Sequence, residues 1–375
     1  MLATYSQKFI LPTYLVILIL LNFSCQQPKR ESLKDEFSSD FRIGVAVNGR
    51  QITDEVDGAD SLLHLHFNSL TPENGLKWSR VHPEEDRYSF EFGDAFVTKG
   101  KELDAFLVGH TLVWHQQIPD WVFQDQEGQL IDAELLQKRL ENHIETVVGR
   151  YKGDIHAWDV VNEAFEDDGT WRKTSWYLLM GEDYIAQAFR KANRIDPNSE
   201  LYYNDYNVWK PEKRKAILEM AQALRKQGVR IDGIGMQGHY RLDFPSLDMI
   251  EQAILDIHEA GFDVMVTELD VDILPRPSDF DGADLEISFA ESERWNPFKD
   301  GITLEKEAEL VRRYQSLFQL FRKHSDKISR VTFWGLQDGS SWLNNWPVRG
   351  RTNFPLLFDR NKRLKPGFLE AMKPE

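Results

Sequence analysis

Short runs of apolar, β-branched and aromatic residues recur from residue 41 onward, and each is followed by a longer stretch of helical composition. Runs of this kind predict buried strands, and the stretches between them predict helices that cross from one strand to the next. One clear helix is expected from Lys210 to a stop at Gly228. The apolar runs are FRIGVAV from Phe41, FNSLTPEN from Phe67, DAFLVGHTLVWH from Asp104, IHAWDVVNE from Ile155, ELYYNDYN from Glu200, GIGMQGHY from Gly233, DVMVTELDV from Asp263 and RVTFWGLQD from Arg330.

Eight such units follow one another without a Pro/Ser-rich linker, a low-complexity tract or a close internal repeat. The pattern therefore predicts an α/β fold, a single-domain (β/α)8 TIM barrel spanning residues 41–375. In this fold the active site is built at the carboxyl ends of the strands.

Polar residues gather late in these runs or directly after them. Each could cap the helix that follows, since Asn and Asp often do so. Helix capping alone does not explain polar residues at the ends of so many strands, so we expect these residues to share one site. They are Asn74, His110, His115, Asn162, Glu163, Asn204, Tyr206, Gln237, His239, Glu268, Asp270 and Trp334.

Two glutamates end apolar runs of their own, Glu163 after DVVN and Glu268 after DVMVT. Either one alone could be a salt-bridged residue on the barrel rim. Two carboxyl groups about 5 to 5.5 Å apart are what retaining glycoside hydrolysis requires, one as proton donor and one as nucleophile. Like charges held so close differ in pKa, so such a pair supplies both protonation states.

The first 25 residues differ in kind from the rest. An apolar run, TYLVILILLNFSC from Thr13 to Cys25, follows a short start that carries Lys8, which predicts a signal peptide rather than a spanning helix. The segment before Cys25, the only cysteine, resembles a loose bacterial lipoprotein cleavage box, from which Asn22 and Phe23 depart. We expect lipid attachment at Cys25 and export to the cell envelope, on the outer membrane or the surface; plain secretion and an uncleaved anchor are the alternatives. Residues 26–40 are polar and are expected to form a tether.

The composition narrows the choice of partners. Forty-five Lys and Arg against 61 Asp and Glu give a net charge of −16, which repels polyanions and argues against nucleic acid. A single cysteine excludes an internal disulfide bond. The 11 tryptophans exceed ordinary packing needs, and aromatic faces stack on sugar rings, although some of these residues will be core.

Five motifs in order carry a specific resemblance: TPENGLKW, GHTLVWHQQIPDW, WDVVNEAF, VTELDV and FWGLQDGSSW. Together they resemble glycoside hydrolase family 10, the endo-β-1,4-xylanases built on (β/α)8 barrels. The resemblance covers residues 41–371. It implies an endo-1,4-β-xylanase that cleaves internal xylosidic bonds with retention of anomeric configuration.

The resemblance also implies roles for residues around the two glutamates. Glu163 matches the general acid/base of the family and Glu268 matches its nucleophile. Asn162 matches the residue that binds the sugar 2-hydroxyl, a contact that strengthens in the transition state. His239 and Asp270 match the pair that holds the nucleophile, because a histidine between two carboxylates can donate to each.

Sugar contacts follow from the same resemblance. The glycone side is expected at Glu73, Asn74 and Lys77, the walls of the subsite for the attacked sugar at His110, Trp114 and Gln117, further lining at Tyr206 and Gln237, and an aromatic pair over the cleft at Trp334 and Trp342. Crowding of a C6 hydroxymethyl group by Trp342 and Gln117 would favour xylose over glucose chains.

The sequence departs from the family pattern at Gln116 and Gly75, and neither change removes a functional group. The loop after Asp270 is long, with a helix resuming near Leu304. We expect this loop to border the cleft, with aglycone contacts through Trp295 or Arg276.

The expected partners are xylan and xylo-oligosaccharides, bound by a monomer that uses no cofactor and no metal. Histidines such as His64, His66, His110 and His115 lack the spacing of a metal site, and a calcium ion on the acidic loops stays open. Two other functions also stay open, namely cleavage of another β-1,4-glycan and a surface protein that binds glycan without turnover.

Overall fold

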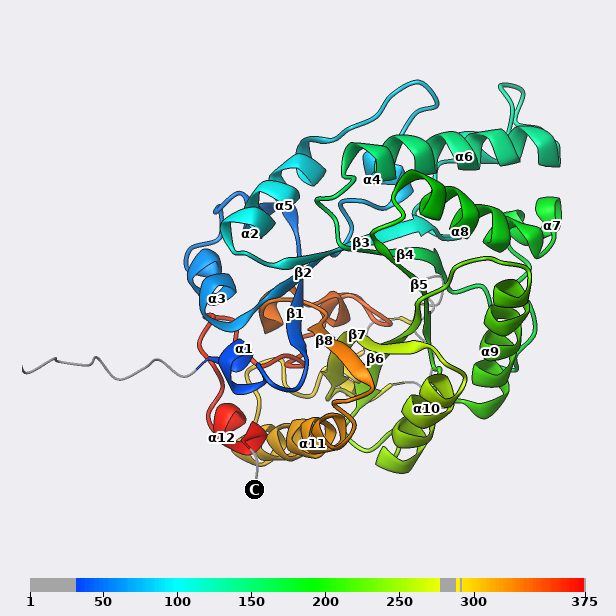
Figure 1. Ribbon diagram of the computed structural model, residues 1–375. Coiled ribbons are helices and arrows are strands. Elements are labelled where there is room, and N and C mark those ends of the chain that lie inside the picture. The colour runs from blue at the N-terminus through cyan, green and yellow to red at the C-terminus, as the bar shows by residue number, and fades with distance from the viewer. Residues whose placement is uncertain (1–31, 277–287, 291, 374–375) are drawn as a thin grey trace, which may run out of the picture. The chain divides into compact units, whose positions relative to one another are not determined.

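The structure is a computed structural model and describes residues 32–276, 288–290 and 292–373. Its strands form a closed parallel barrel in chain order, with β8 pairing back onto β1 (Figure 1). This confirms the predicted (β/α)8 barrel, and each predicted apolar run overlaps one strand. The strands are β1 (Arg42–Val47), β2 (Ser69–Pro72), β3 (Phe106–Val113), β4 (Ala157–Asn162), β5 (Glu200–Tyr206), β6 (Gly233–Arg241), β7 (Asp263–Asp272) and β8 (Ile328–Phe333).

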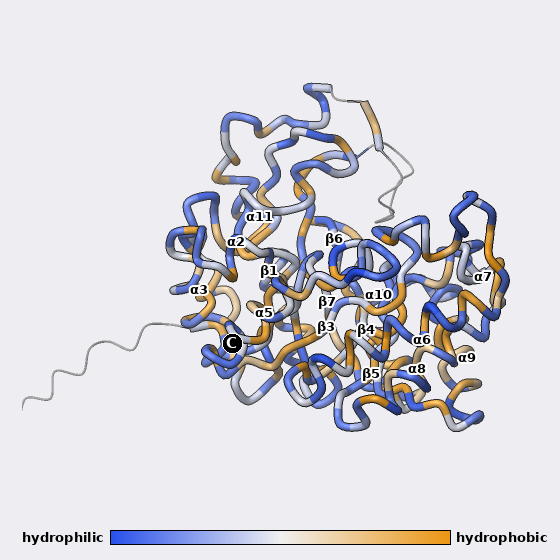
Figure 2. The backbone as a smooth tube through the Cα atoms, turned by 90° about the horizontal axis from the view of Figure 1, so that it is seen from above, coloured by the Kyte–Doolittle hydropathy of each residue, from blue (hydrophilic) through white to orange (hydrophobic). Residues whose placement is uncertain are grey.

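The helices surround the ring of strands, and hydrophobic and hydrophilic stretches alternate along α6, α8 and α9 (Figure 2). The expected helix from Lys210 is α9, with Lys210 as N-cap and a left-handed Gly228 just after its end. The α-helices are α1 (Leu33–Glu36), α2 (Gly49–Ile52), α3 (Ala59–His66), α4 (Trp78–Val81), α5 (Glu91–Glu102), α6 (Ala133–Arg150), α7 (Ser175–Met180), α8 (Asp183–Ile195), α9 (Pro211–Lys226), α10 (Leu247–Glu259), α11 (Leu304–Lys323) and α12 (Phe368–Met372). Short 3₁₀ helices are η1 (Asp120–Val122), η2 (Glu293–Trp295), η3 (Asp338–Ser340) and η4 (Trp342–Asn344). In the described part of the chain, no helix is long and apolar enough to cross a membrane.

The barrel interior at the amino-terminal ends of the strands is filled by side chains from several strands. Val108, Tyr202 and Met265 form a buried cluster with Ala157. Beside it the guanidinium of Arg330, 1% exposed, lies 5.0 Å from the centre of the Tyr202 ring. Because this end of the barrel is filled, the open space that could take a ligand lies toward the carboxyl ends of the strands.

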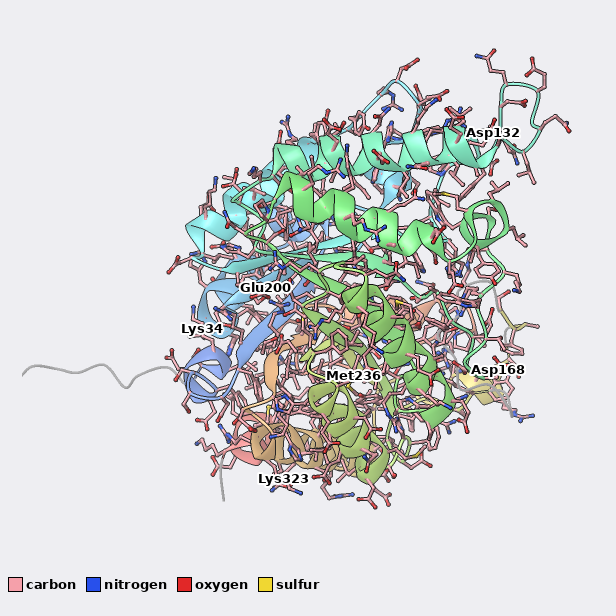
Figure 3. All side chains as sticks on the ribbon, turned by 45° about the vertical axis from the view of Figure 1, so that its right-hand side comes forward. Lys34, Asp132, Asp168, Glu200, Met236 and Lys323 are labelled. Carbon is pink, nitrogen blue, oxygen red and sulfur yellow. The ribbon has the colours of Figure 1, made fainter. Side chains whose placement is uncertain are left out.

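The two faces of the barrel are separate in space. Figure 3 shows Lys34 of α1 and Glu200, the first residue of β5, on one side of the molecule. Asp132, the N-cap of α6 after β3, and Asp168, which follows β4, lie on the opposite side. The carboxyl ends of the strands, which carry the polar residues, therefore lie on the side of the molecule opposite to α1.

The N-terminal boundary of the barrel differs from the expectation. Residues 32–40 do not form a tether, because Leu33 and Phe37 are fully buried and the Phe37 ring lies 5.0 Å from that of Phe318 on α11. Arg322 Nε also donates to Asp40 Oδ2 at 2.9 Å. The apolar side chains of α1 and of Phe37 pack into the core, so the folded domain already includes residues 32–40. The predicted signal peptide, Cys25 and residues 26–31 lie outside the described residues.

Candidate active site

Both predicted catalytic glutamates occupy left-handed backbone conformations. Glu163 directly follows β4 with a φ of 59°, and Glu268 lies within β7 with a φ of 57°. The register between β7 and β8 shifts between Val266 and Leu269, where Glu268 lies. Positive φ is strained for a residue with a side chain and clusters at functional sites. At each position the local backbone turns one side chain out of the regular alternation of the strand.

The two glutamates border one cleft at the carboxyl ends of the strands. The volume of this cleft is about 690 Å³, including the part that is open to solvent. The described residues that line it are Glu73, Asn74, Lys77, His110, Trp114, Gln117, Asn162, Glu163, Gln237, His239, Glu268, Trp334 and Trp342. The structure thus brings together most of the predicted site residues, whereas Asp270, Tyr206, Asn204 and His115 are not part of this lining.

Glu163 is 6% exposed and accepts hydrogen bonds on both carboxylate oxygens. Trp114 Nε1 donates to Oε2 at 2.7 Å, and Asn162 Nδ2 and Gln237 Nε2 each donate to Oε1 at 2.9 Å. Donors from three different strands or strand ends therefore fix the direction of this carboxyl group in the cleft.

Glu268 is held by a row of three groups. Its Oε2 is 3.1 Å from His239 Nε2, and His239 Nδ1 is 3.0 Å from Asp270 Oδ1. Asp270 Oδ2 also accepts a hydrogen bond from Trp342 Nε1 at 2.7 Å. An imidazolium in this position donates from both ring nitrogens, one to each carboxylate.

Burial and the hydrogen bonds within this row shift the pKa values of its three titratable groups in opposite directions. Burial alone would lower the pKa of His239, but the carboxylates of Asp270 and Glu268 raise it to about 9. Burial alone would raise the pKa of Glu268, but the hydrogen bond from His239 and the positive charge of His239 hold it below its usual value. Burial raises the pKa of Asp270, and its contact with His239 opposes that rise. The row therefore keeps Glu268 ionised, as a nucleophile must be.

Asn204 of β5 connects the two glutamates, a role that its position at a predicted strand end does not reveal. Its Nδ2 donates to Asn162 Oδ1 and to Glu268 Oε1, both at 2.8 Å. Its Oδ1 accepts from Thr267 Oγ1 at 2.7 Å. The amides of Asn162 and Asn204 thus form a continuous hydrogen-bonded path from one carboxylate to the other.

One end of the cleft carries a buried ammonium group. Lys77 is 5% exposed, donates to Asn74 Oδ1 at 2.9 Å and lies 4.7 Å from the centre of the Trp114 ring. Burial lowers the pKa of Lys77, and the charges of Glu268 and Glu73 oppose this. Burial likewise raises the pKa of Glu73. Donors and acceptors are therefore presented side by side at this end, as the hydroxyls of a sugar ring require.

Aromatic rings cover the site. Trp342 lies 4.8 Å from the His239 ring and stacks on Trp346 at 4.6 Å, while Trp334 meets His110 edge-on at 5.3 Å. His110 Nδ1 is 2.9 Å from Asp159 Oδ2, a buried partner within WDVVNEAF that no sequence pattern distinguishes from a core position.

Four expectations concern residues near the rim of the cleft. Arg276 does not face the cleft: its side chain is 3% exposed and its Nε binds Asp272 Oδ2 at 2.7 Å. Trp295 lies in η2, outside the lining, and much of the loop before it (residues 277–287 and 291) is outside the described residues. Tyr206 accepts a hydrogen bond from Arg172 Nη2 at 2.5 Å. The expected helix after the loop is α11.

Comparison with known proteins assigns the chain to a family. The model of glycosyl hydrolase family 10 matches residues 32–374, and its start agrees with the buried α1. The chain belongs to glycosyl hydrolase family 10. Its resemblance in five motifs is thereby confirmed over nearly the whole of the described region.

Similar members of family 10 span the same length. An endo-1,4-beta-xylanase A of Xylanibacter ruminicola is 41% identical, covering 95% of this chain and 96% of the relative. An endo-1,4-beta-xylanase of Geobacillus stearothermophilus is 42% identical, covering 90% and 96%. Among solved structures, a GH10 endoxylanase from a sugarcane soil metagenome has a TM-score of 0.88 and 44% identity, covering 91% of this chain and 99% of its own.

Proposed function

We propose that this family 10 chain is an endo-1,4-β-xylanase that cleaves internal xylosidic bonds with retention of configuration. The observation that carries the proposal is the pair of buried glutamates on one cleft, each in a left-handed backbone conformation and joined through Asn162 and Asn204. Relatives named as xylanases match along almost the full length of the chain.

In the proposed first step, the Glu163 carboxyl protonates the glycosidic oxygen while the Glu268 carboxylate attacks the anomeric carbon. The bond to the leaving sugar breaks, and a covalent glycosyl ester forms on Glu268. His239 supports this step because its hydrogen bond keeps Glu268 ionised before attack.

In the second step, the Glu163 carboxylate removes a proton from water, and the water oxygen attacks the anomeric carbon. The ester bond to Glu268 breaks, and the sugar leaves with the configuration it had in the chain. Trp114, Asn162 and Gln237 donate to the Glu163 carboxylate and hold its orientation during this step.

The remaining predicted contacts belong to the proposed substrate site. Glu73, Asn74 and Lys77 would bind hydroxyls on the glycone side, and His110 would face the attacked sugar. Trp342 is fixed by its bond to Asp270 and lies over the nucleophile row, where a C6 substituent on the sugar would meet it. A xylose ring lacks that substituent, which supports xylan over glucan.

We also propose that the protein is exported through its N-terminal signal and attached by lipid at Cys25, and that it acts as a monomer without a cofactor. The support for the anchor is the apolar run ending at Cys25. Mass spectrometry of the N-terminal peptide tests it: a free amine without acyl chains would remove the lipid proposal and leave the barrel chemistry untouched.

The catalytic proposal is tested by reducing-sugar release from glucuronoxylan, with NMR detection of the first anomer formed. We expect wild type to release β-configured xylo-oligomers, and Glu163→Ala and Glu268→Ala each to lose activity by about two orders of magnitude or more. Glu219→Ala is a matched control, because Glu219 is 67% exposed on α9. An α-configured first product, or a higher rate on carboxymethylcellulose, would overturn the assignment.

A further inference from the structure

Strand β5 presents functional side chains on both of its faces, because successive residues of a strand alternate. Asn204 faces the barrel interior and binds Glu268. Tyr203 and Asp205 face the other way, toward the helices. Asp205 Oδ1 there pairs with Lys213 Nζ of α9 at 2.8 Å, and both side chains are fully buried.

This buried pair is connected to the peptide bond that follows Glu163. The N–H of Ala164 donates to Tyr203 Oη at 2.9 Å, and the Tyr203 hydroxyl donates to Asp205 Oδ2 at 2.5 Å. Lys213 then neutralises Asp205. A phenol that donates to a carboxylate is itself a stronger acceptor, so the chain of contacts is cooperative.

Both N–H groups that flank the Cα atom of Glu163 are therefore held by β5. The N–H of Glu163 donates to the carbonyl oxygen of Asn204 at 2.9 Å, and the next N–H donates to Tyr203. These two peptide groups define the backbone dihedrals of Glu163, whose φ is 59°. A strained conformation persists only where its surroundings hold it in place.

Stability of the fold does not by itself explain the Asp205–Lys213 ion pair, since a buried ion pair often contributes no more to the free energy of unfolding than apolar residues would. Burial raises the pKa of Asp205 to about 6, and Lys213 opposes that rise. The ammonium group thus keeps Asp205 able to accept the Tyr203 hydrogen bond at neutral pH.

We propose that Tyr203, Asp205 and Lys213 form a positioning unit that holds Glu163 in its left-handed conformation, with the carboxyl aimed at the glycosidic oxygen. The inference rests on the proposed acid/base role of Glu163. None of the three side chains is among the described residues that line the cleft, so they act through the backbone and not on the substrate.

Leaving-group dependence separates this role from a merely structural one. A sugar leaving group needs its proton from Glu163, whereas a 2,4-dinitrophenolate leaves without one. For Tyr203→Phe we expect kcat/KM on xylotetraose to fall about tenfold or more, with kcat/KM on 2,4-dinitrophenyl β-xylobioside within about twofold of wild type. Asp205→Asn should show the same split, and it carries the comparison if Tyr203→Phe fails to fold.

Tyr202→Phe is the matched control. Tyr202 is the preceding residue, is also buried and donates to Asp263 Oδ2 at 2.6 Å, but it lies in the cluster that fills the other end of the barrel. It should show no split between the two substrates. Equal loss on both substrates in Tyr203→Phe, or no loss on either, would overturn the positioning role. Inactivity of wild type on both would instead refute the proposed function.

Discussion

Replacing His239 by Gln tests the charge balance around Glu268 directly. The amide keeps one neutral donor but removes the positive charge between Glu268 and Asp270. Without that charge, burial raises the pKa of Glu268, which must be ionised for attack. We therefore expect the acid limb of the kcat/KM profile to move up by about one pH unit or more, so that activity falls further at low pH than at neutral pH.

The size of the effect follows from the pKa of His239. Its rise from 6.5 to about 9 corresponds to roughly 3 kcal/mol of net stabilisation of the imidazolium, after burial has opposed the two carboxylates, and the site is buried so no discount for exposure applies. A raised pKa in the folded state gives stabilisation that is complete below pH 6.5 and is lost as the pH rises through about 9. His239→Gln should then lower the free energy of unfolding by up to about 3 kcal/mol at low pH and by much less above pH 9.

Two measurements check this reasoning, a pH–rate profile on an aryl β-xylobioside and urea unfolding at several pH values. His258→Gln is a control for loss of a histidine, since His258 lies in the last turn of α10 outside the cleft. If the acid limb of His239→Gln stays where it is in wild type, and the destabilisation is the same at every pH, then the imidazolium does not set the ionisation of Glu268.

Three further outcomes are expected. Trp342→Phe removes both bulk and the donor to Asp270, and should raise kcat/KM for cello- relative to xylo-oligosaccharides about tenfold; an unchanged ratio would show that Trp342 does not exclude glucose. Asn204→Ala removes three buried hydrogen bonds, and should cost about 2 to 4 kcal/mol in urea unfolding and lower kcat steeply; wild-type values of both would contradict the bridging role. Phe37→Ala should cost about 3 to 5 kcal/mol of stability with kcat unchanged, whereas an unmoved unfolding midpoint would restore residues 32–40 as a tether.

The barrel and most of the site could be predicted from the sequence because parallel barrel strands are buried on both faces. Such strands read as nearly continuous apolar runs, so a Glu163 or Glu268 at the end of one stands out. The resemblance then assigned roles to residues that the fold brings onto one cleft, from Glu73 to Trp342.

Short or irregular segments carry too weak a sequence pattern to predict their packing. In LKDEF only Leu33 and Phe37 are apolar, and one helical turn is too short for periodicity to appear against the charges around it. Arg276 follows the nucleophile strand in a loop, and nothing in the sequence shows that it folds back onto Asp272. A charged residue near a predicted cleft can as well support its wall as contact a ligand.

The sequence by itself determined the order of strands, the residue types at their ends and the alternation that separates Asn204 from Tyr203 and Asp205. Only the tertiary structure decided which face of β5 meets the cleft and which partners each polar group finds. Those partners, Thr267 on β7 and Lys213 on α9, lie on other elements. A hydrogen bond depends on positions within a few tenths of an ångström, and these arise from strand register and barrel closure, which no local pattern encodes.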